Sequence, residues 1–88
     1  MYYVYVLGTK DRERKIYIGF TSDLKERIKG HRSGDTDYTR NNDWELVYYE
    51  SYKSEEDARE RERQLKKDGR SKYWLKRRIE NSLDVVTK

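Results

Sequence analysis

Two basic side chains lie on a face where a short predicted helix is otherwise apolar. Leu24 and Ile28 are the apolar residues of this helix. At helical spacing, Arg27 and His31 fall on the same side. Arginine is seldom fully buried unless it is paired, and burying an unpaired charge is costly. We therefore expect this face to border a cleft, although both side chains could instead extend to solvent at the helix end.

A carboxylate occupies a similar position in the next predicted helix. Ala58 and Leu65 mark the apolar side of this helix, and Glu62 lies between them at helical spacing. Mg²⁺ keeps several of its waters and binds proteins through one or two carboxylates, so Glu62 alone could hold it. The alternative is a structural ion pair to Arg27 or Arg61.

Two tyrosines complete a chemically coherent set. Tyr5 and Tyr17 lie in consecutive strand-like runs, and Gly19 follows close behind, where a glycine within a strand often marks the close approach of a ligand or of other protein atoms. The structural alternative is that both rings simply pack and leave their hydroxyls in water. Together these groups would supply a metal ligand, a cation that neutralises phosphoryl charge, and a phenol and an imidazole for proton transfer. We expect the helix face that carries Arg27 and the helix face that carries Glu62 to meet beside the two tyrosines.

Alternating apolar residues define the strands that would position these groups. Three runs cover residues 2–7, 15–20 and 45–52, and the charged connection at 8–14 favours an antiparallel hairpin between the first two. Strand alternation places Val4 and Val6 on one face and Tyr5 and Leu7 on the other. We expect the face that carries Tyr5 to carry Tyr17 as well.

Helix signals follow the second and third strands. Asp23 with Glu26 matches a capping box, and Ser54 precedes three acidic residues. Gly69 and Ser71 predict a helix end and a new N-cap, followed by a third helix over 72–82. The result is an α+β fold in which a single small domain, residues 1–83, has a three-stranded antiparallel sheet flanked by about three helices. Residues 84–88 are predicted to be a frayed tail.

Composition excludes several classes of site. The 88 residues include no cysteine and one histidine, which rules out disulfides and a zinc centre of the usual type. The chain has neither a signal-like start nor a run long enough to span a membrane, so we expect a cytoplasmic protein without a membrane partner, with association with the nucleoid possible in principle. A monomer is the default expectation.

Positive charge is concentrated in one stretch. The net charge is +4, yet residues 59–78 alone hold ten basic and three acidic residues. A phosphate backbone is the simplest partner for such a patch, although basic helices are often only solvated faces.

The order and spacing of these residues resemble a GIY-YIG nuclease domain, specifically the short stand-alone group that begins Tyr-Val-Tyr. The likeness covers about residues 2–80. One signature is intact as Tyr17-Ile18-Gly19, and the other stands as Tyr3-Val4-Tyr5, without its glycine. The resemblance also includes Arg27, His31, Tyr38-Thr39-Arg40 and Ala58-x-x-x-Glu62.

The resemblance implies hydrolysis of nucleic-acid phosphodiesters with one divalent metal, Mg²⁺ or Mn²⁺, held at Glu62. Tyr17 would activate the attacking water, and Tyr5 would orient water or phosphate. Arg27 would contact the scissile phosphate, and His31 would relay a proton.

The expected activity is that of a metal-dependent endonuclease of low sequence specificity, which acts on DNA rather than RNA. Branched, nicked or single-stranded DNA are the candidate substrates, and the expected role is of the repair or recombination type. Family nucleases usually carry a separate targeting domain, so substrate choice here would depend on a targeting protein partner or on the chain's own basic and loop residues. One alternative is an inactive nucleic-acid-binding module, and another is a protein-interaction domain anchored by Trp44 or Trp74. The residues expected to bind nucleic acid are Tyr38, Arg40, Lys66, Lys67, Arg70, Lys72 and Arg77.

Overall fold

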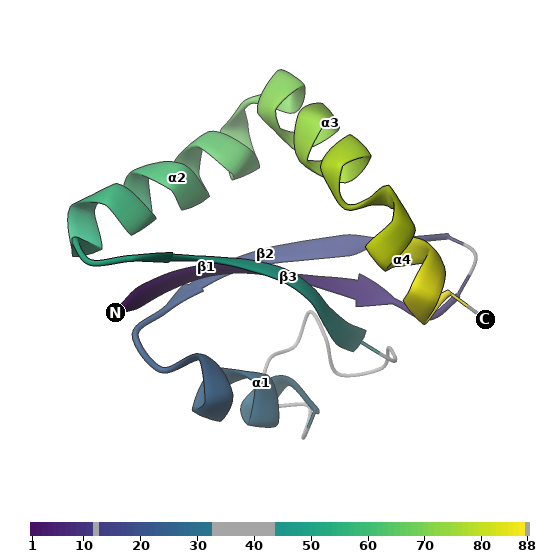
Figure 1. Cartoon of the computed structure of the whole chain (residues 1–88), viewed down its shortest axis with the longest axis horizontal. Helices are drawn as coiled ribbons and strands as arrows, with labels where there is room; N and C mark the ends of the chain where they lie inside the picture. The colour runs from purple at the N-terminus through teal and green to yellow at the C-terminus, as the bar shows by residue number, and fades with distance from the viewer. Residues whose placement is uncertain (12, 33–43, 88) are drawn as a thin grey trace.

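Three strands form one antiparallel sheet in the order β2-β1-β3, with helices on both of its faces (Figure 1). The computed structural model describes residues 1–11, 13–32 and 44–87, except for the side chains of residues 31 and 32. The elements are β1 (Tyr2–Thr9), β2 (Ile16–Thr21), α1 (Leu24–Arg32), β3 (Trp44–Tyr52), α2 (Glu55–Lys67), α3 (Gly69–Arg78) and α4 (Glu80–Val86). The predicted α+β class and the three-stranded antiparallel sheet are confirmed.

The central strand divides its side chains between two cores. Val4 and Val6 are buried with the residues of α2, α3 and α4 on one face of the sheet. Tyr5 and Leu7 are buried on the other face, where α1 packs. Figure 1 shows α2, α3 and α4 on one side of the sheet and α1 on the other. The predicted alternation in β1 is therefore confirmed, and Tyr17 lies with Tyr5 on the α1 side.

The helix caps agree with the sequence at α1 and α2. The backbone N–H of Glu26 donates to the Asp23 carboxylate at 3.1 Å, and that of Asp57 donates to Ser54 Oγ at 3.4 Å. Each cap satisfies a backbone donor that a helix start would otherwise leave unpaired.

The predicted break between two helices near Gly69 is confirmed, but the predicted N-cap at Ser71 is wrong. Asp68 ends α2 and also caps α3, because its carboxylate accepts from Arg70 N at 3.0 Å and from Ser71 Oγ at 2.9 Å. Gly69 is the first residue of α3. An aspartate that serves both helices makes a separate stop and start unnecessary.

The predicted third helix is in fact two helices. The chain leaves helical geometry at Ile79, which is buried, and α4 then continues through Val86. Leu83 is buried against the sheet, and Arg14 forms an ion pair with Asp84. The predicted frayed tail is therefore helical over residues 84–86. In the ranges that the structure describes, no helix combines the length and apolar character that crossing a membrane requires.

Candidate active site at an edge of the sheet

Gly19 lets the side chain of Tyr5 lie across the edge strand. Tyr5 in β1 pairs directly with Gly19 in β2. A Cβ atom at residue 19 would lie 2.3 Å from both Cζ and Oη of Tyr5, a distance at which no side chain fits. The glycine is therefore needed for the close approach of the phenol, which is fully buried.

Tyr17 stands beside Tyr5 on the same face of the sheet. The two ring centroids are 6.3 Å apart, and the rings are tilted by 40°. Tyr17 also meets Trp44 edge to face, with 6.4 Å between centroids. Tyr5 and Tyr17 share a hydrogen bond that raises the pKa of the Tyr5 phenol, which is the direction expected when the Tyr5 hydroxyl is the donor.

Charges from both helix layers act on the Tyr5 hydroxyl. Burial is the main cause that raises the pKa of Tyr5, and the neighbouring charge of Tyr17 raises it further. Arg27 lowers this pKa and Glu62 raises it, so both side chains lie within electrostatic range of one hydroxyl. Four of the predicted site residues are thus brought together.

This arrangement corrects one part of the sequence interpretation. We expected the Arg27 face of the first helix to meet the Glu62 face of the second, but α1 and α2 lie on opposite sides of the sheet (Figure 1). The two side chains instead act around the edge strand β2, at the point where Tyr5 passes over Gly19. The edge, rather than a helix–helix cleft, is where the layers share a site.

Glu62 is partly accessible to solvent and forms an ion pair with one lysine. Its side chain is 20% exposed, and its carboxylate lies 3.0 Å from Nζ of Lys66, one helical turn along α2. Neither alternative partner considered from the sequence is its salt-bridge partner, because Arg61 binds Glu50 and Arg27 forms no salt bridge with it. Lys66, predicted to contact nucleic acid, thus also neutralises the predicted metal ligand.

The donor set at this edge suits a lightly held divalent ion. Across the described residues there is no group of three or more acidic or histidine side chains that could enclose a metal. A single accessible carboxylate matches Mg²⁺, which keeps several waters and completes its shell with substrate phosphate. Glu62 therefore fits as the one protein ligand of such an ion.

The other predicted site residues are placed as follows. His31 lies in the last turn of α1, and its side chain is outside the described part of the structure. Tyr38 and Arg40 also lie outside the described residues. The remaining cations follow one another along α2 and α3; Lys67, Arg70 and Arg77 are exposed, and Lys72 is half-buried.

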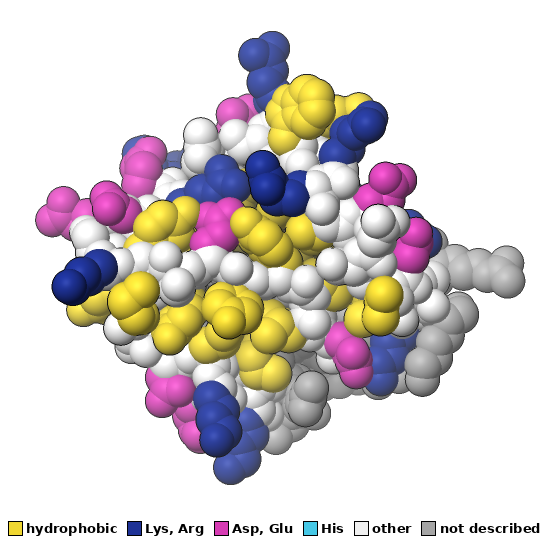
Figure 2. All heavy atoms as spheres, in the orientation of Figure 1, with side chains coloured by type: hydrophobic (Ala, Val, Ile, Leu, Met, Phe, Trp, Pro, Cys, Tyr) yellow, Lys and Arg dark blue, Asp and Glu magenta, His cyan; other side chains and the backbone are white. Residues whose placement is uncertain are grey.

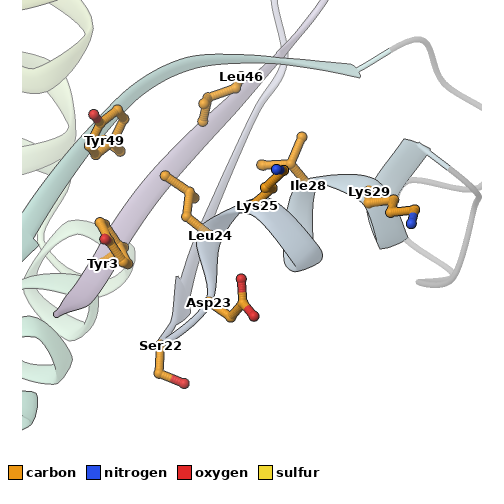
Figure 3. A pocket seen from close by; sticks show the side chains of 9 residues that line it. All are labelled: Tyr3, Ser22, Asp23, Leu24, Lys25, Ile28, Lys29, Leu46 and Tyr49. Atoms are coloured by element: carbon orange, nitrogen blue, oxygen red, sulfur yellow. The ribbon is translucent and has the colours of Figure 1, made fainter.

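A groove runs beside the site on the α1 face. It has a volume of about 730 Å³ and lies between α1 and strands β1 and β3 (Figure 3). Leu24 and Ile28 line it, as expected for a helix face that borders a cleft, whereas Arg27 is not among its lining residues. Tyr3, two residues before Tyr5 on the same face, extends the groove toward the candidate site. The lining residues are Tyr3, Ser22, Asp23, Leu24, Lys25, Ile28, Lys29, Leu46 and Tyr49.

A second carboxylate cluster, which the sequence analysis missed, lies on β3. Glu50 accepts from Tyr48 Oη at 2.6 Å, from Tyr52 Oη, and from Arg61 Nε at 2.9 Å. Burial acts to raise the pKa of Glu50, but the hydrogen bonds from Arg61 and the two tyrosines outweigh it and lower this pKa. The alternation of Tyr48, Glu50 and Tyr52, which puts all three on one face of a strand, was the available signal.

Comparisons with known proteins identify the family of the chain. The family model described as the GIY-YIG catalytic domain matches residues 1–74, which include Tyr5, Tyr17, Arg27 and Glu62. The chain is 41% identical to the UPF0213 protein CPE1444 of Clostridium perfringens, over 76% of this chain and 72% of that protein. It is 38% identical to a UPF0213 protein of Pediococcus acidilactici, over 98% and 89% of the two chains. Among solved structures, the solution NMR structure of the UPF0213 protein BH0048 of Bacillus halodurans matches with a TM-score of 0.52 and 35% identity, over 85% of this chain and 82% of that one.

Proposed function

The chain belongs to the GIY-YIG catalytic-domain family, and from this membership we propose that it is a metal-dependent endonuclease that hydrolyses DNA phosphodiester bonds with low sequence specificity. The observation that carries the proposal is the crossing of Tyr5 over Gly19 beside Tyr17 at the β2 edge, where Arg27 and Glu62 both lie within electrostatic range of the Tyr5 hydroxyl. A cation for the phosphate, a carboxylate for a metal and two phenols within one site are the groups that phosphodiester hydrolysis needs.

Arg27 and Glu62 have complementary roles in this proposal. Arg27 is exposed on α1 and supplies fixed positive charge to the scissile phosphate. Glu62 would hold Mg²⁺ or Mn²⁺, which would supply positive charge for the leaving oxygen.

The two tyrosines divide the handling of the proton. Burial keeps Tyr5 protonated, because it raises the pKa of this phenol well above its ordinary value. In this mechanism the half-buried Tyr17 enters the step as a phenolate, and the hydrogen bond from the Tyr5 hydroxyl stabilises the negative charge on its oxygen. Tyr17 then takes a proton from the attacking water and becomes a neutral phenol, while Tyr5 orients Tyr17. His31 remains a predicted proton relay.

A second candidate function is a nucleic-acid-binding module without catalysis. One observation favours it: the carboxylate that should bind the metal is ion-paired to Lys66. An exposed pair of this kind is worth less than about 1 kcal/mol, which is too little to exclude a divalent ion at millimolar concentration. We therefore place catalysis first.

The deciding experiment is DNA cleavage by the wild type and by Glu62→Gln, with Mg²⁺, with Mn²⁺ and with a chelator. Plasmid, nicked, forked and single-stranded DNA, together with matched RNA, form the substrate panel. Glu60→Gln is the matched control, because Glu60 lies on the same helix and pairs with the exposed Arg63. We expect Glu62→Gln to reduce cleavage by about 100-fold or more, comparable to the loss of one transition-state-stabilising group, and Glu60→Gln to leave it unchanged.

Two results would reject the endonuclease. The first is a wild type that cleaves nothing in the panel, and the second is a Glu62→Gln variant that cleaves as well as the wild type. Metal-free binding that survives Glu62→Gln without any cleavage would establish the binding module instead.

A further inference from the structure

Helix α3 carries positive charge that the rest of the protein does not neutralise. Its ten residues include five basic side chains and no acidic one. In α2, by contrast, Arg59, Arg61 and Arg63 each bind a glutamate. Among the residues that the structure describes, the arginines of α3 (Arg70, Arg77 and Arg78) form no ion pair with a carboxylate. These guanidinium groups are available to an anionic partner.

Two aromatic rings are exposed among these arginines. Trp74 is 61% exposed and Tyr73 is 53% exposed, and their rings meet edge to face with 5.3 Å between centroids. At helical spacing Trp74 has Arg70 one turn before it and Arg77 and Arg78 one turn after it. The next residue, Leu75, is buried in the core, so α3 is anchored by one side and presents Trp74 on the other.

The aromatic and basic groups share one recess. It has a volume of about 630 Å³ and is lined by Arg61, Ser71, Trp74, Leu75, Arg77 and Arg78. Arg61 is held by Glu50, which leaves Arg77 and Arg78 as its available cations. Figure 2 shows hydrophobic side chains together with Lys and Arg side chains over α3. We call the surface formed by Trp74, Arg77 and Arg78 of this recess, together with Tyr73 beside Trp74, the α3 platform.

The exposed indole and guanidinium groups of the α3 platform favour one kind of ligand. A nucleobase that is not paired offers a flat face that can stack on an indole, and its phosphate can bind a guanidinium. Base stacking in a duplex hides those faces, and an acidic peptide would use the arginines while leaving the indole in water. We propose that the α3 platform binds unpaired nucleotides of the nucleic-acid substrate, with Trp74 as the stacking residue. This inference rests on the proposed function for the identity of the substrate.

The platform and the candidate active site lie on opposite flanks of α2. Arg61, which lines the recess, extends to Glu50 on β3, whereas the adjacent Glu62 acts on Tyr5 at the β2 edge. A substrate with a junction between duplex and single strand could contact both places at once.

The test is binding without metal, so that it does not depend on cleavage. The probe is an oligothymidylate of about 12 nucleotides, compared with a blunt duplex of the same length, and the readouts are fluorescence anisotropy of the labelled DNA and quenching of tryptophan emission. Trp44 is buried, so a stacked base should quench Trp74. The variants are Trp74→Ala, Trp74→Phe and the control Tyr49→Ala, which removes a similarly exposed aromatic ring from β3.

We expect Trp74→Ala to weaken oligothymidylate binding about tenfold, Trp74→Phe to restore most of it, and Tyr49→Ala to change it little. The inference is overturned if duplex binds as tightly as single strand, if Tyr49→Ala costs as much as Trp74→Ala, or if polyglutamate competes through Trp74 and thereby identifies a protein surface. Cleavage by a protein whose Trp74→Ala variant binds normally would reject the platform alone. Trp74-dependent binding without any cleavage would reject only the endonuclease.

Discussion

Two clusters in this protein are built from the same four kinds of side chain, but their carboxylates are bound differently. The Glu50 cluster on β3 contains one glutamate, two tyrosines and one arginine, and the site at the β2 edge contains one glutamate, two tyrosines and one arginine as well. In the Glu50 cluster every other member donates to the carboxylate. At the β2 edge the two tyrosines share a hydrogen bond, and the salt-bridge partner of the Glu62 carboxylate is Lys66, which is not one of the four residues.

The difference teaches that saturation of the carboxylate, rather than composition, separates a structural cluster from a candidate active site. Glu50 has its hydrogen-bonding capacity filled by groups fixed on the sheet and on α2, so it has little to offer a ligand. Glu62 is partly exposed and can exchange its exposed lysine for a metal ion. The following predictions separate the two clusters.

The largest effect should come from closing the space over β2. Gly19→Val would place a side chain within 2.3 Å of the Tyr5 ring, so the ring must leave its position. We expect a loss of about 1–3 kcal/mol in the free energy of unfolding and a loss of cleavage of about 100-fold or more, measured by urea denaturation and by the plasmid assay.

Gly69→Ala is the matched glycine control for that variant. A Cβ at residue 69 meets nothing within 4 Å, and the position begins α3. Stability should be unchanged or rise by about 0.5 kcal/mol, with cleavage unaffected. If Gly19→Val cleaved as well as Gly69→Ala, Tyr5 would have no place in the active site.

The next effect should appear at the Glu50 cluster and should be confined to stability. Glu50→Gln removes the countercharge of Arg61 and replaces one carboxylate oxygen by an NH2 group, which cannot accept from the donors that face it. We expect a loss of about 2 kcal/mol in the free energy of unfolding, with cleavage per folded molecule unchanged. Glu62→Gln should show the reverse pattern, with stability within about 0.5 kcal/mol of the wild type. Matching stability losses in the two variants would erase the distinction between the clusters.

A smaller effect should follow pH. The pKa of Glu50 is lower in the folded protein than the ordinary value of 4.5, so the folded state favours the charged form. The stability that this preference supplies is complete above the unfolded pKa and is lost as pH falls through the folded pKa. We expect the stability of the wild type to fall more steeply below pH 4.5 than that of Glu50→Gln, as measured by urea denaturation across this range. Parallel curves for the two proteins would show that the hydrogen bonds to Glu50 do not lower its pKa in the folded state.

Local pattern predicted the sheet well because strand alternation and burial act together. The alternation in β1 placed the valines and Tyr5 on their correct faces, and Gly19 marked the close approach that the structure shows. The break at Ile79 could not be seen, because Leu75, Ile79 and Leu83 keep helical spacing through it. Periodicity reports which side of a segment is buried, but it does not report where the backbone turns.

The candidate site was only partly accessible to the same reasoning. Arg27 and Glu62 stood out because each is a charge on an apolar face, but which faces of the sheet the two helices cover is set by tertiary packing. Pairs between different elements could not be predicted either. Arg61 on α2 and Glu50 on β3 are eleven residues apart, and no helical or strand spacing connects them. The Glu62 and Lys66 pair was visible from sequence, since residues four apart on a helix are neighbours.

That pair gives the smallest predicted effect and the finest test of the comparison. Lys66→Met removes the cation from Glu62 and keeps a long side chain on α2. Because an exposed pair of this kind is worth about 0.3–0.5 kcal/mol, the variant should need about twofold less Mg²⁺ for half-maximal cleavage. Lys67→Met is the control, as it removes an exposed lysine one position further along the same helix.

The direction of the change decides what Lys66 does. If it mainly competes with the metal, Lys66→Met lowers the Mg²⁺ requirement while Lys67→Met does not. If it mainly contacts nucleic acid, Lys66→Met weakens DNA binding and reduces the salt dependence of that binding, because one fewer phosphate is neutralised. If neither the Mg²⁺ requirement nor DNA binding responded to Lys66→Met, the ion would not be held at Glu62. The Glu62 carboxylate would then be as structural as that of Glu50, and the contrast between the two clusters would fail.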